Sequence, residues 1–177
     1  MAKGMYHYIK EAWKNQAPEI LRKRMEEWRD GDAVTKVEKP LRLDRARTLG
    51  YKAKPGFIVA RVKLMRGGRR RPRTKAGRQS GNQTIRKTLL MNYQWVAEQR
   101  AAKRFINLEV LNSYLIGKDG TYAFYEVIMV DPKHPQIIAD KDINWICNER
   151  GRVFHGRTSA ARKSRGLRAR GNKRMKR

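Results

Sequence analysis

The strongest structural signal in this chain lies in residues 108–130, which read LEVLNSYLIGKDGTYAFYEVIMV. Two runs rich in aromatic and β-branched residues, 108–116 and 122–130, flank the turn GKDG at residues 117–120. A turn that combines glycine and aspartate between two such runs is typical of a β-hairpin. We therefore expect two antiparallel strands, the second ending at Asp131-Pro132, because proline cannot donate to a strand ladder.

Upstream of the hairpin, the alternating run FIVARVKL at residues 57–64 predicts a third strand. Its Arg61 and Lys63 would share one face and point at solvent or at phosphate. Helices are expected where apolar residues recur at helical spacing or where proline, aspartate and glycine mark the ends. These segments are residues 5–13, a helix from Pro18 that stops at Gly31, a short basic helix with Asp44 as N-cap and Gly50 as terminator, residues 88–104, and a short helix from Pro135.

These elements predict an α+β fold, in which a small and mostly antiparallel sheet packs with helices. A chain of 177 residues is long enough for one domain with appendages. We expect a single globular body over residues 1–149, interrupted by a long basic loop at about residues 66–84. The stretch 150–177 reads as a basic, extended C-terminal tail, because few of its residues are large and apolar.

The charge distribution points to a nucleic acid. The chain has 43 Lys and Arg against 16 Asp and Glu, a net charge of +27. Residues 45–97 hold 15 of the bases and residues 150–177 hold 12, and neither stretch contains an acidic residue, whereas the remainder is nearly balanced. Blocks of one sign repel themselves and are neutralised best by an external polyanion.

Arginine dominates both acid-free stretches, most densely in the run RRRPR at residues 69–73. A guanidinium group matches phosphate oxygens, stacks on bases and keeps its charge when partly desolvated. In the tail, Gly, Ser and Ala alternate with the charges and would let the backbone approach a phosphate chain closely. The alternative interpretations are a solvated basic loop, a nuclear import signal and a solubilising tail.

Enzymatic chemistry has little support in the sequence. No catalytic triad spacing, metalloprotease motif or phosphate-binding glycine loop is present. One cysteine, Cys147, and three scattered histidines predict neither a disulfide nor a structural metal site. We expect no cofactor, any Mg²⁺ being associated with RNA, and no small-molecule substrate. No apolar run is long enough for a membrane span.

Five segments, in this order along the chain, resemble the L15e-type family of archaeal and eukaryotic large-subunit ribosomal proteins. They are LGYKAK at 49–54, LNSY at 111–114, EVIMVDP at 126–132, DINWI at 142–146 and residues 158–167. His134-Pro135 and the compact tail look like the archaeal branch. The resemblance implies a structural constituent of the ribosome in the cytoplasm, with large-subunit ribosomal RNA and neighbouring ribosomal proteins as partners and no catalytic residues.

The resemblance implies RNA contacts at residues 51–54, 69–78 and 162–167, and the charge map selects the same places. The expected RNA-binding residues are Tyr51, Lys52, Lys54, Arg61, Lys63, Arg66, Arg69, Arg70, Arg71, Arg73, Lys75, Arg78, Arg152, Arg157, Arg162, Lys163, Arg165, Arg168, Arg170, Lys173 and Arg174. Two alternatives stay open. One is a DNA-compacting protein, and the other is an RNA-processing nuclease in which Asp140 and Asp142 hold a metal.

Overall fold

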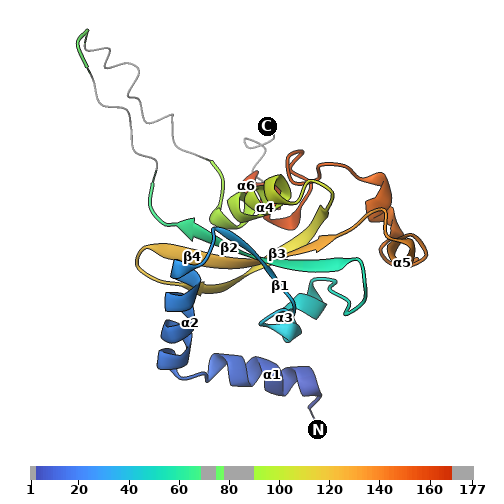
Figure 1. The fold of residues 1–177 in the computed structure, drawn as a ribbon, viewed down its shortest axis with the longest axis horizontal. Helices are drawn as coiled ribbons and strands as arrows, with labels where there is room; N and C mark the ends of the chain where they lie inside the picture. Colours follow the sequence, from blue (N-terminus) through green and yellow to red (C-terminus); the bar gives the residue numbers. More distant parts are fainter. Residues whose placement is uncertain (1–2, 69–74, 78–89, 169–177) are drawn as a thin grey trace.

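Four antiparallel strands form one sheet, in the order β1-β2-β4-β3 (Figure 1). The computed structural model describes residues 3–68, 75–77 and 90–168. The strands are β1 (Val34–Val37), β2 (Phe57–Met65), β3 (Glu109–Lys118) and β4 (Tyr122–Val130). The predicted α+β class with a small antiparallel sheet is confirmed.

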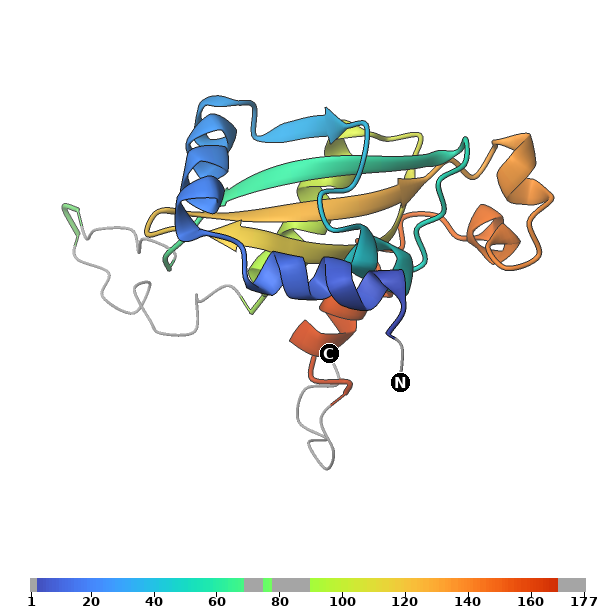
Figure 2. The same cartoon turned by 90° about the horizontal axis from the view of Figure 1, so that it is seen from below.

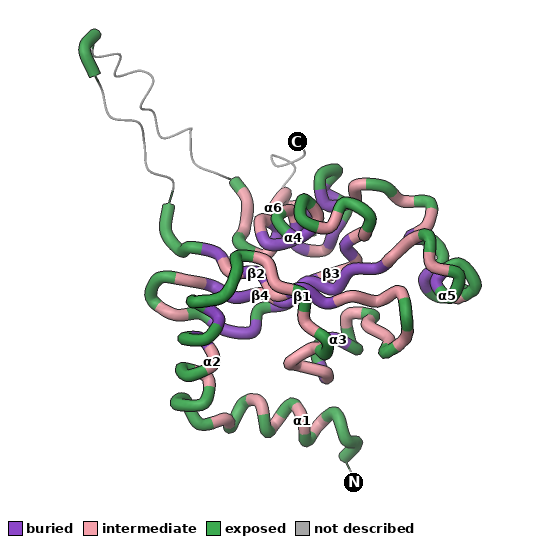
Figure 3. The backbone as a smooth tube through the Cα atoms, viewed as in Figure 1, coloured by how far each residue is buried: buried purple, intermediate pink, exposed green. Residues whose placement is uncertain are grey.

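Helices cover both faces of the sheet. They are α1 (Met5–Lys14), α2 (Pro18–Asp30), α3 (Leu43–Thr48), α4 (Tyr93–Arg104), α5 (Pro135–Ile138), the 3₁₀ helix η3 (Asn144–Asn148) and α6 (Ser159–Ser164). Helices α4 and α6 lie on one face, and α1, α2 and α3 lie on the other (Figures 1 and 2). Helix α1 has no buried residue, as its pink and green tube in Figure 3 shows.

The hairpin between β3 and β4 forms as predicted. Two hydrogen bonds of Asp119 stabilise the turn. Its backbone N–H donates to the Tyr122 carbonyl at 2.9 Å, and its carboxylate accepts from the Thr121 N–H at 2.7 Å. Strand β4 has the predicted bounds, while β3 extends to Lys118 and contains two register shifts. At the second shift, a side chain on Gly117 would lie 3.2 Å from the Met25 sulfur. Glycine therefore lets α2 approach the sheet.

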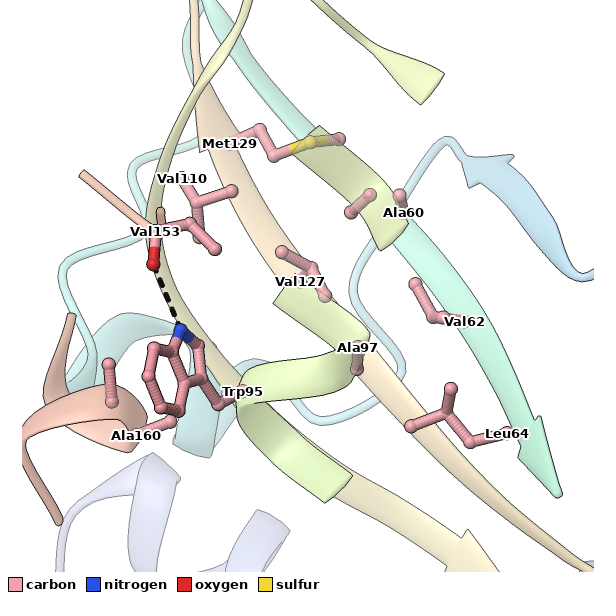
Figure 4. Close-up of a cluster of buried hydrophobic side chains, with 12 residues drawn as sticks. Ala60, Val62, Leu64, Trp95, Ala97, Val110, Val127, Met129, Val153 and Ala160 are labelled. Atoms are coloured by element: carbon pink, nitrogen blue, oxygen red, sulfur yellow. Dashed lines mark hydrogen bonds between the residues drawn. The ribbon is translucent and has the colours of Figure 1, made fainter. Parts of the chain in front are cut away.

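The larger core cluster lies between the sheet and α4. Alternate residues of β2 and β4 point toward α4, whose Trp95 donates through Nε1 to the Val153 carbonyl at 2.9 Å (Figure 4). The cluster consists of Ala60, Val62, Leu64, Trp95, Ala97, Ala101, Val110, Val127, Met129, Val153, Ala160 and Ala161. Small alanines on α4 and α6 allow both helices close to the sheet.

A second cluster fills the opposite face, where Trp28 of α2 packs edge-on against Phe124 of β4 with ring centroids 5.3 Å apart. A third cluster joins Val130, at the end of β4, to Ile137, Ile143 and Ile146 around α5 and η3. The apolar stripe predicted for the second helix is thus a core face, as its spacing indicates.

Two predicted helix starts were wrong. Helix α4 begins at Tyr93 rather than near residue 88, because the Asn92 side chain accepts the Trp95 N–H at 2.8 Å and its backbone is extended. In α3 the N-cap is Arg42, and Asp44 lies inside the helix, buried and 3.3 Å from the Arg42 guanidinium. Strand β1 was not predicted, since four residues that include Thr35 and Lys36 give little pattern.

Residues 150–168 pack onto the body, which corrects the expectation of an extended tail from residue 150 for this stretch. Val153, Thr158, Ala160 and Ala161 are buried, and Thr158 caps α6. The small residues Ala160 and Ala161 allow α6 to approach α4. Residues 169–177 of the expected tail, and residues 69–74 and 78–84 of the expected loop, lie outside the described residues.

Candidate nucleic-acid interface

Lys52 and Lys54, two predicted RNA contacts, bind carboxylates of the chain itself. The Lys52 ammonium lies 2.9 Å from Asp140 and 2.8 Å from Asp142, and Lys54 also bonds to Asp140. The bonds to Asp142 and Asp140 raise the pKa of Lys52, and those from Lys54 and Lys52 hold the pKa of Asp140 below its usual range. This cluster joins the segment before β2 to the segment after α5.

The same cluster accounts for the two carboxylates that raised the nuclease alternative. Asp140 and Asp142 are each bound by a lysine ammonium, which is a structural use of both side chains. In the described part of the chain, no group of three or more His, Cys, Asp or Glu could hold a metal ion. The contacts of Asp140 and Asp142 therefore favour a role in joining two segments.

Arg61 and Lys63 share a face of β2, as predicted, but α2 covers that face. The Arg61 guanidinium lies 5.1 Å from the centre of the Trp28 ring, and burial lowers the pKa of Arg61. Lys63 donates to the carbonyls of Arg29 and Gly31 at 2.5 and 2.8 Å. Both cations thus contact α2 or the residue that follows it, and these contacts help to hold α2 on the sheet.

Two further predicted contacts, Arg152 and Arg157, bind groups within the body. Arg152 donates to the Val110 carbonyl at 2.9 Å and stacks on Trp145 at 4.6 Å, and burial lowers the pKa of Arg152. Arg157 forms an ion pair of 2.5 Å with Glu149.

Tyr51 and Arg66 also make contacts within the chain. Tyr51 packs edge-on against Phe57 at a centroid distance of 5.9 Å, and Arg66 bonds to the Asp119 carbonyl. The remaining expected contacts fall into three groups. Lys75, Arg162, Lys163 and Arg168 are exposed, and Arg165 is half-buried. Arg69, Arg70, Arg71, Arg73, Arg78, Arg170, Lys173 and Arg174 lie outside the described residues.

Glu98 fixes the position of α6. Its carboxylate is fully buried and accepts from the hydroxyls of Ser113 and Thr158, both at 2.5 Å. Burial raises the pKa of Glu98. Because Thr158 is the N-cap of α6, these bonds place the start of α6 between α4 and β3. The exposed Arg162 and Lys163 of α6 are thereby held beside α4.

The exposed side of α4 carries three bases that the sequence analysis did not select. Arg100, Lys103 and Arg104 follow the i, i+3, i+4 spacing that places side chains on one helix face, and all three are exposed. Arg100 and Lys163 line one groove, so this face continues onto α6. We define Arg100, Lys103, Arg104, Arg162 and Lys163 as the α4 surface. Within the described residues, no carboxylate forms an ion pair with any of them.

The α4 bases were missed because residues 98–149 are nearly balanced in charge. The structure shows where the acids of that stretch lie. Glu98 and Glu126 are buried, Glu109 accepts the Gly151 N–H at 2.7 Å, and Asp140 binds two lysines. These carboxylates are buried or bound to groups within the fold, whereas the three bases of α4 are exposed at the surface. The helical spacing of the three bases was the available signal.

The chain is similar to known proteins over nearly its whole length. A family model described as Ribosomal L15, of the L15e type, matches residues 4–177. The chain is 50% identical over 176 residues to the large ribosomal subunit protein eL15 of Methanocorpusculum labreanum. The matched region covers 97% of this chain and 91% of that protein. Within the described residues, no helix has the length and apolar character needed to cross a membrane.

Proposed function

The chain belongs to the ribosomal L15e family, and from this premise we propose that it is a structural component of the large ribosomal subunit that binds large-subunit ribosomal RNA through the α4 surface, the basic loop and the basic C-terminal end. The relative in Methanocorpusculum labreanum is named for that subunit. Neighbouring large-subunit proteins are its further partners. Membership of a ribosomal protein family agrees with the expectation that the chain has no catalytic role.

The segregation of charge supports this proposal most directly. The two acid-free stretches hold 15 and 12 bases, and four of the acids elsewhere, Glu109, Glu126, Asp140 and Glu149, bind partners within the fold. The α4 surface faces outward with no carboxylate to neutralise it among the described residues. A basic surface on the folded body, in a chain that also carries two acid-free basic segments, suits an RNA that surrounds part of the protein.

Binding by this arrangement replaces diffuse counterions with fixed cations. Ten simultaneous phosphate contacts correspond to a slope of about −7 to −9 in a plot of log affinity against log salt concentration. Base readout contributes little on duplex RNA, because the deep and narrow groove of A-form RNA hides the base edges. We expect specificity to come from the shape of the folded RNA.

Neither alternative from the sequence analysis gains support. The nuclease would use Asp140 and Asp142, which bind lysines of the chain. DNA compaction would predict similar affinity for duplex DNA, and the family is one of ribosomal proteins. Competition between ribosomal RNA and duplex DNA of equal charge distinguishes the two polyanions, and equal competition would contradict a preference for RNA.

Neutralising the α4 surface tests the proposal. The triple variant Arg100→Gln, Lys103→Gln and Arg104→Gln should make the salt slope shallower by about 2 to 3 and should weaken binding to large-subunit ribosomal RNA. The matched control is Arg22→Gln with Lys23→Gln. Both control residues are exposed on α2, a helix that also carries Glu19, Glu26 and Glu27. The control should change the slope much less, and an equal effect of both variants would contradict a defined surface.

A further inference from the structure

An apolar groove of about 880 Å³ opens on the α4 side of the sheet, where β2 ends and α4 begins. Met65, Met91, Tyr93 and Tyr125 are among its lining residues, and Arg100 and Lys163 bring two cations to it. The groove therefore adjoins the α4 surface and shares Arg100 and Lys163 with it. None of the described residues that line it is acidic.

The aromatic wall of the groove is held in place by the backbone. The Tyr93 hydroxyl accepts the Gly67 N–H at 2.8 Å and donates to the Gly67 carbonyl at 3.0 Å. The Tyr93 side chain stays accessible, with 37% of the residue exposed. Holding the ring in one position lowers the entropy lost when a ligand stacks on it.

Tyr125 and Met65 provide the rest of the apolar contact area. Tyr125 extends from β4 and is half-buried, and among the described residues its hydroxyl has no hydrogen-bond partner. Burial and the neighbouring Tyr93 raise the pKa of Tyr125, so the ring brings no negative charge. Met65, the last residue of β2, is 68% exposed, which is unusual for a large apolar side chain.

The cations stand where a phosphate could reach them from the groove. One Arg100 guanidinium nitrogen donates weakly to the Lys63 carbonyl at 3.5 Å, and its other N–H groups are available for an anion. Lys163 is exposed on α6, whose position Glu98 fixes through Thr158. An apolar aromatic slot between an arginine and a lysine is suited to a nucleotide, which combines a flat apolar base with an anionic phosphate.

We propose that this groove takes an unpaired nucleotide of the large-subunit ribosomal RNA, with its base against Tyr93, Tyr125 and Met65 and its phosphate at Arg100 or Lys163. This inference rests on the function proposed above, and it adds a stacking site to an interface otherwise based on charge. Stacking of unpaired bases on aromatic side chains is how proteins hold single-stranded RNA without reading its sequence. The absence of acid among the described lining residues favours RNA over a basic peptide, and the two cations favour it over an apolar one.

A photoreactive side chain in the groove tests the occupant directly. The full chain with Met65→p-benzoylphenylalanine is assembled into large subunits, which are isolated by sedimentation, irradiated and analysed by mass spectrometry. The expected result is an adduct between residue 65 and one discrete nucleotide. An adduct to another protein or to this chain itself would overturn the proposal, and so would no adduct in subunits that contain the probe.

Affinity measurements separate this inference from the proposed function. Tyr125→Leu keeps apolar volume but removes the ring, and it should weaken binding to ribosomal RNA about tenfold without changing the salt slope. The control Tyr8→Leu replaces an exposed tyrosine of α1 and should have no effect. Equal affinity of Tyr125→Leu and the unsubstituted chain would remove the groove site while leaving the charge-based function intact. Failure of the unsubstituted chain to bind would remove the proposed function itself.

Discussion

At the scale of single residues, buried carboxylates make the fold sensitive to pH. Glu98 accepts from two hydroxyls, and Glu126 accepts from the Leu41 N–H and the Tyr114 hydroxyl. Burial raises the pKa of both carboxyls. The folded chain therefore binds protons at these sites more tightly than the unfolded chain does. Their contribution to stability is fully present at low pH and is lost as pH rises through the folded-state pKa values.

Replacing Glu98 by glutamine should remove part of this pH dependence. Glutamine keeps the shape and can still bond to Ser113 and Thr158, but it carries no charge at any pH. Relative to the unsubstituted chain, Glu98→Gln should gain stability as pH rises from about 5 to about 7. Urea unfolding at both pH values measures the difference. If the free energies of unfolding of the two proteins differ by the same amount at both pH values, the raised pKa of Glu98 is contradicted.

Asp140 should make stability depend on pH in the opposite direction from Glu98. Its pKa is held below the ordinary value of 3.8, so its contribution to stability is present above that value and is lost as pH falls toward the folded-state pKa. Asp140→Asn should therefore be less stable than the unsubstituted chain near pH 6, by an amount that shrinks toward about pH 3. Asp142→Asn is the control, because that side chain is 80% exposed and bonds only to Lys52 among the lysines. A larger effect for Asp142→Asn would contradict the assignment.

At the scale of elements, local signals could be predicted and distant partners could not. The β3–β4 hairpin and the stripe of α2 depend on residues that are close in sequence, and both were confirmed. The ion pair between Lys52 and Asp140 could not be predicted, because the two residues lie 88 positions apart. Short elements such as β1 and α6 carry too few residues for a periodic pattern, and tertiary packing decides their structure.

Helix α6 offers a test of how packing places surface cations. Ala161 is fully buried against the α4 side of the sheet. Ala161→Leu should cost about 1 to 3 kcal/mol through overpacking, and it should weaken RNA binding by displacing Arg162 and Lys163. Ala12→Leu on α1 is the control, since Ala12 is exposed and the change should stay within about 0.5 kcal/mol. Unchanged stability of Ala161→Leu would show that α6 is not packed as described.

At the scale of the whole molecule, the fold separates the two signs of charge. Carboxylates such as Glu98, Glu109 and Glu126 bind partners within the body, whereas the α4 surface remains basic and outward-facing. The sequence predicted the class of partner because the acid-free stretches are visible without a structure. It could not predict which cations bind groups of the chain itself, as Arg61 and Lys63 do at α2 and at the residue that follows it. The groove also needed the structure, since its lining comes from four separate elements.

The most direct test of the account is sedimentation of a lysate from cells that produce the tagged full chain, through density gradients in low and in moderate salt. The account predicts that the chain migrates with the large ribosomal subunit in both, because many simultaneous phosphate contacts hold it there. Migration as a free small protein in low salt would contradict the account.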